Sequence, residues 1–182
     1  MIKLEKICKS YGENKVLEDF SFHFKKGEKY YINSASGQGK TTLLRIIMNL
    51  EQPDHGNVYV NGNLSVVFQE DRLIENISVL KNIEFATKNN ETLKKIELFG
   101  LKGFENAPIS SLSGGMKRRV AILRGMLYNH DVLLLDEPFR GLDDEIKNIV
   151  IKEIKALKST VIITTHIKDE IEKMEIINQI NL

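Results

Sequence analysis

The sequence predicts an α/β fold in which a parallel core sheet is joined to an N-terminal antiparallel β subdomain and an inserted helical subdomain. Residues 28–33 lead into a loop of small residues and residues 40–47 continue as a helix, so the segment has strand–loop–helix order. Two unbroken apolar runs, 132–135 and 161–164, are typical of parallel strands covered on both faces. The helical pattern at 143–157 between them is the expected crossover.

Near the N-terminus, apolar and polar residues alternate. Ile2 and Leu4 follow this period of two, and so do Phe20, Phe22 and Phe24. The pattern indicates half-buried strands, which we expect to be antiparallel.

The segment after the first helix predicts two further strands and then helices. Residues 57–60 and 65–68 are strand-like, with Asn61 and Gly62 between them as a strong turn signal. Residues 71–106 are mostly helical in pattern.

Two residues mark helix ends in this helical segment. Ser78 is suited to an N-cap and Gly100 to a C-terminal stop. The predicted division of this single domain is a core at 1–69 and 118–182, which includes the antiparallel β subdomain and binds nucleotide, and a helical subdomain at 70–117.

Composition excludes some functional classes. The chain has 182 residues, 42% of them hydrophobic, which suits one globular domain with a real core. The net charge is only +1, so no long-range field favours a nucleic acid partner. The single cysteine, Cys8, cannot form an internal disulfide and fits a reducing compartment. No apolar run approaches membrane-spanning length, so we expect any membrane role to depend on another subunit.

The loop at 34–42 is the first candidate site. Gly39, Lys40 and Thr41 fit the pattern Gly-x4-Gly-Lys-Ser/Thr, in which backbone N–H groups surround phosphates, lysine reaches the outer phosphates and the hydroxyl meets Mg²⁺. Position 34, however, is serine. If that position needs positive φ, serine costs about 1–2 kcal/mol there, and Gly37 would have to supply the flexibility. The alternative is a Gly/Ser-rich turn before an ordinary helix.

Two carboxylates follow the apolar run at 132–135. Ligands of open α/β sheets lie at the carboxyl ends of strands, where Asp136 and Glu137 fall. Adjacent strand residues point in opposite directions, so we predict separate roles: Asp136 binds Mg²⁺, and Glu137 polarises the water that attacks a γ-phosphate. The alternative is a solvated acidic turn.

A third candidate site is the sequence Leu-Ser-Gly-Gly-Met at 112–116. Two glycines after Ser113 precede a basic helical segment, and a helix start of this kind exposes backbone N–H groups that favour an anion.

These motifs occur in the order seen in ATP-binding subunits of ABC transporters, and the resemblance covers nearly the whole chain. The segments at 68–73 and 112–120 resemble bacterial importers of small anions and nutrients of the nitrate, sulfonate and taurine kind. The resemblance implies a P-loop NTPase fold with a RecA-like parallel core sheet. It rests on the loop at 34–42, Gln69, the motif at 112–115, Asp136 and Glu137, Gly141 to Asp143, and His166.

The resemblance also assigns roles within one chain. Tyr11 would stack on adenine, although an exposed turn tyrosine is an alternative. His166 would contact the γ-phosphate, where a plain surface histidine is the alternative. The implied ATP-binding residues are Tyr11, Ser34, Ala35, Ser36, Gly37, Gln38, Gly39, Lys40, Thr41 and Thr42; the metal ligands are Thr41, Gln69 and Asp136; the catalytic residues are Glu137, His166, Gln69 and Lys40.

Other implied residues act between chains. Ser113, Gly114 and Gly115 would close over ATP bound by a second ATP-binding subunit, in a homodimer or a heterodimer, and Asp143 would lie at that interface. The further partners that the resemblance implies are integral membrane permease subunits and a solute-binding protein, and it implies no nucleic acid partner. Association with the permease subunits would place the chain at the cytoplasmic face of the membrane. Met116 stands where glutamine is commoner.

The resemblance predicts a transport-coupled ATPase that needs ATP and Mg²⁺ and powers import of a small solute. Two alternatives stay open. One is a degenerate or regulatory nucleotide-binding subunit, and the other is a soluble ABC ATPase without a transport role.

Overall fold

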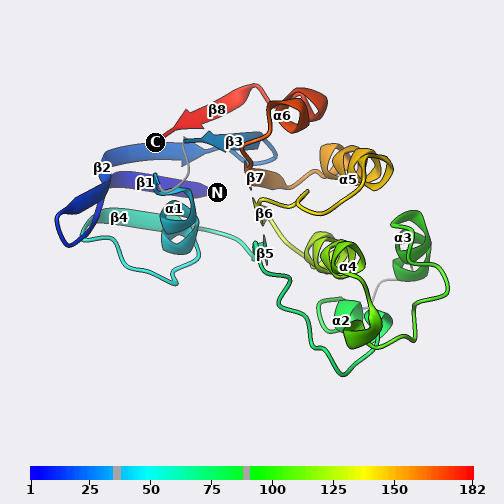
Figure 1. The fold of residues 1–182 in the computed structure, drawn as a ribbon. Coiled ribbons are helices and arrows are strands. Elements are labelled where there is room, and N and C mark those ends of the chain that lie inside the picture. The colour runs from blue at the N-terminus through cyan, green and yellow to red at the C-terminus, as the bar shows by residue number, and fades with distance from the viewer. Residues whose placement is uncertain (35–37, 88–90) are drawn as a thin grey trace.

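The computed structural model describes residues 1–34, 38–87 and 91–182, and it confirms the predicted α/β fold (Figure 1). A parallel sheet and a separate antiparallel sheet are packed with helices around two apolar cores. The elements are β1 (Ile2–Tyr11), β2 (Asn14–Phe24), β3 (Lys29–Asn33), α1 (Lys40–Ile47), β4 (His55–Val60), β5 (Leu64–Val67), α2 (Val79–Glu84), α3 (Thr92–Leu98), a 3₁₀ turn (Ile109–Ser111), α4 (Gly114–Leu127), β6 (Val132–Asp136), α5 (Asp144–Ala156), β7 (Thr160–Thr164), α6 (Lys168–Met174) and β8 (Asn178–Asn181).

The parallel sheet has the strand order β5-β6-β7-β3-β8 over the described residues. Its central strands are apolar on both sides because each side faces a different core. Leu133 and Leu135 of β6 pack with α4 and α5, whereas Val132 and Leu134 pack with α1 and the antiparallel sheet. This alternation explains why the sequence of β6 is an unbroken apolar run rather than a half-polar one.

The antiparallel sheet has the order β2-β1-β4, as the alternating pattern predicts for β1 and β2. Helix α1 lies between this sheet and the parallel one, with Leu43, Leu44, Ile46 and Ile47 all buried. The helix that follows the phosphate loop is therefore held from two sides. This packing gives the loop a rigid base.

The turn signal at Asn61 and Gly62 does not close a hairpin. β4 pairs with β1 in the antiparallel sheet, and β5 pairs with β6 in the parallel sheet, so the turn carries the chain from one sheet to the other. Gly62 has φ 119°, and a Cβ there would lie 2.7 Å from a carboxylate oxygen of Asp131. Only glycine fits this crossing without a shift of its neighbour.

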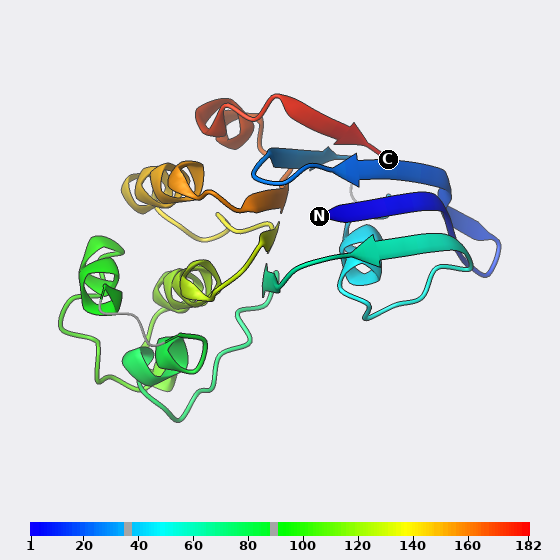
Figure 2. The ribbon, with the colours of Figure 1, turned by 180° about the vertical axis from the view of Figure 1, so that it is seen from behind.

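The helical subdomain at 70–117, or helical lobe, contains less helix than its sequence pattern predicts. α2 and α3 are short, and irregular chain runs from Phe68, just after β5, to Ser78 at the start of α2. The two predicted helix ends are confirmed: Ser78 accepts a hydrogen bond from Lys81 N at 3.2 Å, and Gly100 follows α3 with φ 65°. Figures 1 and 2 show this lobe and the antiparallel sheet at opposite ends of the molecule.

None of the helices in the described residues combines the length and the apolar character that a bilayer crossing needs.

From the packing of the core, we expect two leucine-to-alanine substitutions to differ clearly in their effect on the free energy of unfolding. Leu134 of β6 is fully buried on the side of the parallel sheet that packs against α1, whereas Leu93 is 57% exposed on α3. Leu134→Ala should lower the free energy of unfolding by about 2–5 kcal/mol, because it leaves a cavity. Leu93→Ala should change it by less than about 0.5 kcal/mol. Urea unfolding of both variants measures the difference, and equal losses would contradict the assigned core.

Candidate functional site

The carboxyl ends of the central parallel strands border a cavity of about 450 Å³. Such strand ends are where open α/β sheets bind ligands. All of the residues that the sequence analysis names as catalytic or metal-ligating line this one cavity. Its walls are Gly39, Lys40, Thr41, Thr42, Gln69, Asp136, Glu137 and His166.

The phosphate-loop end of the cavity is built by α1 and β2. α1 begins directly after Gly39, whose φ is 92°, and a Cβ there would lie 2.8 Å from Val16 Cγ1. Lys40 Nζ donates a hydrogen bond to Ser34 O at 2.6 Å, so its ammonium group lies across the loop. Ala35, Ser36 and Gly37, which the sequence analysis assigns to ATP binding, lie outside the described residues.

The serine at position 34 is not strained as a left-handed residue. Among the described residues, the non-glycine residues with positive φ are Lys6, Asp19, Asn49, Arg72, Glu137 and Glu175. Ser34 is absent from this set, so the cost of about 1–2 kcal/mol for a left-handed serine does not arise.

Asp136 is the last residue of β6 and is held by its neighbour across the sheet. Thr164 Oγ1 donates a hydrogen bond to Asp136 Oδ1 at 2.5 Å. Burial raises the pKa of Asp136 above its ordinary value, and the nearby Glu137 carboxylate also raises this pKa, while the Thr164 hydrogen bond and Arg118 oppose the rise. The site therefore holds a carboxylate that water does not fully solvate.

Glu137 differs from its sequence-based prediction. The two carboxylates do not point away from each other, since both line the cavity. Glu137 lies beyond the end of β6 with φ 46°, and this left-handed backbone breaks the strand alternation. Its N–H donates to Thr164 O at 3.1 Å.

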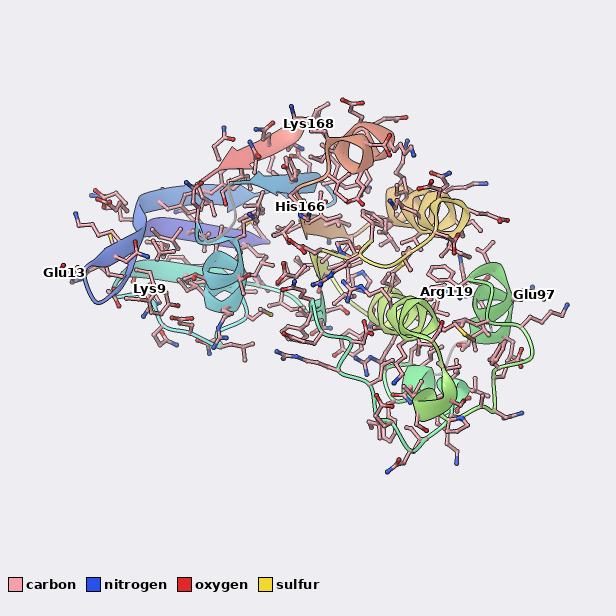
Figure 3. The ribbon with its side chains drawn as sticks, viewed as in Figure 1. Lys9, Glu13, Glu97, Arg119, His166 and Lys168 are labelled. Atoms are coloured by element: carbon pink, nitrogen blue, oxygen red, sulfur yellow. The ribbon has the colours of Figure 1, made fainter. Side chains whose placement is uncertain are left out.

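His166 completes this side of the cavity. It lies two residues beyond β7, at the centre of the molecule (Figure 3). Its Nδ1 is 3.3 Å from Glu137 Oε1. The histidine side chain is 70% exposed and that of Glu137 is 25% exposed, so the pair reaches from the protein wall to open solvent.

The sequence analysis missed Arg118, which is buried at the back of the site. Its guanidinium donates to Phe68 O at 2.6 Å and to Glu137 O at 2.9 Å, and burial lowers its pKa from the ordinary value. A signal was present in the sequence. Arg118 stands three and four residues before Ala121 and Ile122, which are both buried, and so lies on the apolar stripe of α4.

The glycine motif at the start of α4 lies outside the cavity. Ser113 is the N-cap of α4, and its Oγ accepts from Met116 N at 3.3 Å, as a helix start requires. A Cβ on Gly115 would lie 2.9 Å from Gly141 O. The structure thus brings the motif at 112–116 against the turn at Gly141.

Two other predicted residues have local structural partners. Asp143 is the N-cap of α5, and its carboxylate accepts from Ile146 N at 2.9 Å. Tyr11 is 49% exposed at the end of β1, and its hydroxyl donates to Glu51. Neither lines the cavity that holds Lys40.

Comparisons with known proteins point to one family. The family model described as ABC transporter matches residues 17–140. The aliphatic sulfonates import ATP-binding protein SsuB 1 of Shouchella clausii is 38% identical over 93% of this chain and 72% of that protein. The taurine import ATP-binding protein TauB of Pelagibacter ubique is 36% identical, over 85% and 66%.

A further relative is longer than this chain. The spermidine/putrescine import ATP-binding protein PotA of Legionella pneumophila is 34% identical over 93% of this chain but only 53% of its own length. The chain therefore spans about half the length of these PotA relatives. Among solved structures, the ATP-binding cassette MJ0796, a dimer in a post-hydrolysis state with ADP and Pi, has a TM-score of 0.86 and 28% identity and covers 100% of this chain and 94% of its own.

The buried carboxylate of Asp136 predicts a pH-dependent stability difference. Because its folded pKa is raised, the folded chain keeps the proton to higher pH than the unfolded chain does, and stability falls as the pH rises from about 3.8 through the folded pKa. Asp136→Asn removes the buried charge and retains an acceptor for Thr164. Without nucleotide it should melt at a higher temperature than wild type at about pH 8, with a gain that shrinks toward about pH 4.

The matched control is Asp144→Asn, which removes a carboxylate that is 87% exposed. It should show no gain that grows with pH. A lower melting temperature for Asp136→Asn at about pH 8 would show that the ionised carboxylate is favoured by its surroundings.

Proposed function

Because the chain belongs to the ABC transporter family, we propose that it is the ATP-binding and ATP-hydrolysing subunit of a transporter that imports a small solute. The observation that carries this proposal is the convergence of Lys40, Asp136, Glu137 and His166 on one cavity. A degenerate nucleotide-binding subunit would not need a carboxylate and an imidazole placed together beside a phosphate loop.

Phosphate binding would use the start of α1. Lys40 carries a positive charge at the loop, and the first N–H groups of α1 have no partners within the helix, so both favour the β- and γ-phosphates. In the structure Lys40 Nζ donates to Ser34 O, and ATP would take over part of that contact. The loop residues from 34 to 42 would surround the phosphates.

The side chains at the cavity fit Mg²⁺. Thr41, Gln69 and Asp136 offer a hydroxyl, an amide oxygen and a carboxylate, which are the hard oxygen ligands that Mg²⁺ prefers. In the described part of the chain no cluster of three or more His, Cys, Asp or Glu side chains could hold a metal. The ion would therefore share its ligands with ATP and water, and it would supply charge neutralisation at the phosphates. It would also offset the buried charge of Asp136.

Hydrolysis would use Glu137 as the general base. Its carboxylate takes a proton from water as the water oxygen forms a bond to the γ-phosphorus and the bond to the bridging oxygen of ADP breaks. His166 lies 3.3 Å from that carboxylate and would hold it toward the γ-phosphate. Gln69, where the core joins the helical lobe, would contact the attacking water.

A second ATP-binding subunit would complete each site. Ser113, Gly114 and Gly115 lie outside the cavity of their own chain, which supports their use on ATP held by a partner. Asp143 would lie at the same interface, beside the turn at Gly141 that Gly115 contacts. Tyr11 would stack on adenine. Binding of two ATP molecules would close the dimer, and hydrolysis would release it.

Membrane permease subunits would contact the helical lobe, placing the chain at the cytoplasmic face of the membrane. This lobe exposes Ile74, Phe85 and Phe104, and apolar side chains of this kind favour a protein partner. A solute-binding protein would deliver the cargo. The relatives are named for anionic and cationic solutes alike, sulfonates and polyamines, so the cargo would be chosen by the other subunits.

The role of Glu137 predicts separate effects on binding and chemistry. Glu137→Gln should bind ATP within about threefold of wild type, lose about 100-fold or more in turnover, and accumulate an ATP-bound dimer. ATPase assays on the assembled transporter, together with nucleotide binding and gel filtration, measure these effects. Glu145→Gln, an exposed change in the first turn of α5, is the control and should keep its turnover. Normal turnover in Glu137→Gln would remove Glu137 as the base.

Sharing of sites between chains predicts complementation. Ser113→Arg and Lys40→Ala should each abolish turnover in a transporter that holds two copies of this chain. In an equal mixture, half of the dimers are mixed, and each of these keeps one site with both intact residues, so turnover should recover to about a quarter of wild type.

Recovery would be absent if Ser113 acted within its own chain, because every site would then carry one defect. The matched control is Ser111→Arg, an equally bulky change in the 3₁₀ turn just before the motif. It should leave turnover unchanged.

A further inference from the structure

We propose that Arg118 is a positioning residue that holds the backbone of Gln69 and of Glu137 together, so that the two catalytic loops move as one unit with α4. The inference rests on the proposed function, since it concerns the same hydrolysis. It adds a residue that touches neither nucleotide nor water but acts through two residues that do.

The guanidinium lies between two loops, one that precedes α4 in the sequence and one that follows it. From the loop after β5, Phe68 O and Gln69 O accept hydrogen bonds from Nη1 at 2.6 and 3.3 Å. From the end of β6 and the loop that follows it, Asp136 O and Glu137 O accept from Nη2 at 3.0 and 2.9 Å. The fork of one rigid group therefore sets the distance between the loops.

Two further contacts fix the guanidinium itself. Nε donates to Pro138 O at 2.9 Å, and Nη1 lies 3.3 Å from Asp71 Oδ1. Arg118 is only 4% exposed. Burial of this charge is tolerated because a carboxylate and five carbonyl oxygens surround it. Movement of the side chain would leave several of these acceptors unpaired at once.

The contact to Glu137 matters because that residue is strained. A left-handed conformation in a non-glycine residue costs about 1–2 kcal/mol and persists only where neighbours hold it. Glu137 has φ 46°. Its N–H donates to Thr164, and its C=O accepts from Arg118 at 2.9 Å, so both of its peptide groups are fixed. This conformation is what turns the carboxylate into the cavity.

The connection extends along α4 to the glycine motif. Arg118 is five residues after the N-cap Ser113, or about 7.5 Å along one continuous helix. A phosphate that binds at Ser113 and displaces α4 must therefore displace the guanidinium. The carbonyls of Gln69 and Glu137 would follow, which couples dimer closure to the placement of the base.

The next residue shows that this arrangement is specific to one position. Arg119 is on the side of α4 that faces α3 (Figure 3), where its Nη1 donates to Phe99 O at 3.0 Å. It contacts neither catalytic loop. A lysine at 118 would keep a charge but not the fork, because an ammonium group is a single point that cannot reach both loops with fixed geometry.

The test is a double-mutant cycle with Glu137 in the assembled transporter. Arg118→Met keeps an unbranched side chain that can pack where the arginine stem lies, and it removes the donors. It should lower kcat about 10- to 100-fold while the Kd for ATP changes less than about threefold. In a Glu137→Gln background the same change should cost less than about threefold, because the base it positions is already gone. Arg118→Lys should recover only part of the loss.

Controls separate positioning from folding. Arg124→Met removes a second, partly buried guanidinium of α4, which reaches Asp71 O in the loop after β5 but has no hydrogen bond to the loop after β6. It cannot hold the two loops together, so this variant should keep kcat. If Arg118→Met melts below the assay temperature, Asp71→Asn decides, since it removes the charge partner of Arg118 without opening a large cavity. We then expect a drop of about 3- to 10-fold in kcat at unchanged ATP affinity.

The outcomes are distinct. The inference is overturned if folded Arg118→Met has the kcat of wild type or, where that variant does not fold, if Asp71→Asn does. It is also overturned if Arg118→Met lowers kcat equally with Glu137 and with Gln at position 137. These results would leave the proposed function intact as long as wild type hydrolyses ATP. Absence of wild-type turnover in the assembled transporter would overturn the proposed function and the inference with it.

Discussion

Thr164 of β7 pairs with β3 on one side and with β6 on the other. This register aligns the carboxyl ends of the three strands at the cavity. Thr164 stands opposite Ile32 of β3 and opposite Asp136 of β6. Its hydroxyl donates to the Asp136 carboxylate, and its oxygens accept from Glu137 N. A slip of one residue in this ladder would turn the apolar side chains of β7 to the wrong cores and separate the carboxylates from the phosphate loop. The polar site is thus a consequence of apolar packing on both faces of the sheet.

Several residues in and behind the cavity are expected to lower the folding stability of the chain. Asp136 is an acid whose charge is partly buried, Glu137 has a left-handed backbone, and Arg118 is a buried cation. Each is less favourable than an apolar residue in a relaxed conformation would be. They lie together because each one offsets another: Arg118 pairs with the carbonyls that the strained turn exposes, and a bound cation would offset Asp136. The surrounding Leu, Ile and Val residues of the two cores provide the stability that this arrangement needs.

Local patterns in the sequence predicted most of the fold. The apolar runs of β6 and β7 and the helix of 40–47 follow from period and residue type, which depend on neighbours a few positions away. Three features escaped that reasoning because they depend on residues far apart in the chain. The turn at Gly62 joins two sheets instead of two paired strands, the left-handed Glu137 faces the same cavity as Asp136, and Arg118 reaches loops about 20 and 50 residues away. Sequence motifs identified the residues that line the cavity. Arg118, whose guanidinium contacts both loops from behind the cavity, belongs to no motif.

The contact between Gly115 and the carbonyl of Gly141 has a consequence for how such a protein changes over generations. Every replacement of Gly115 adds a Cβ, which would lie 2.9 Å from that oxygen, so no substitution is small enough to be neutral in the present geometry. A single codon change there must displace the turn before α5. Because the atom in the way is a backbone oxygen, which every residue carries, no side-chain change at position 141 would make room, and glycine would be retained at 115 while its neighbours vary.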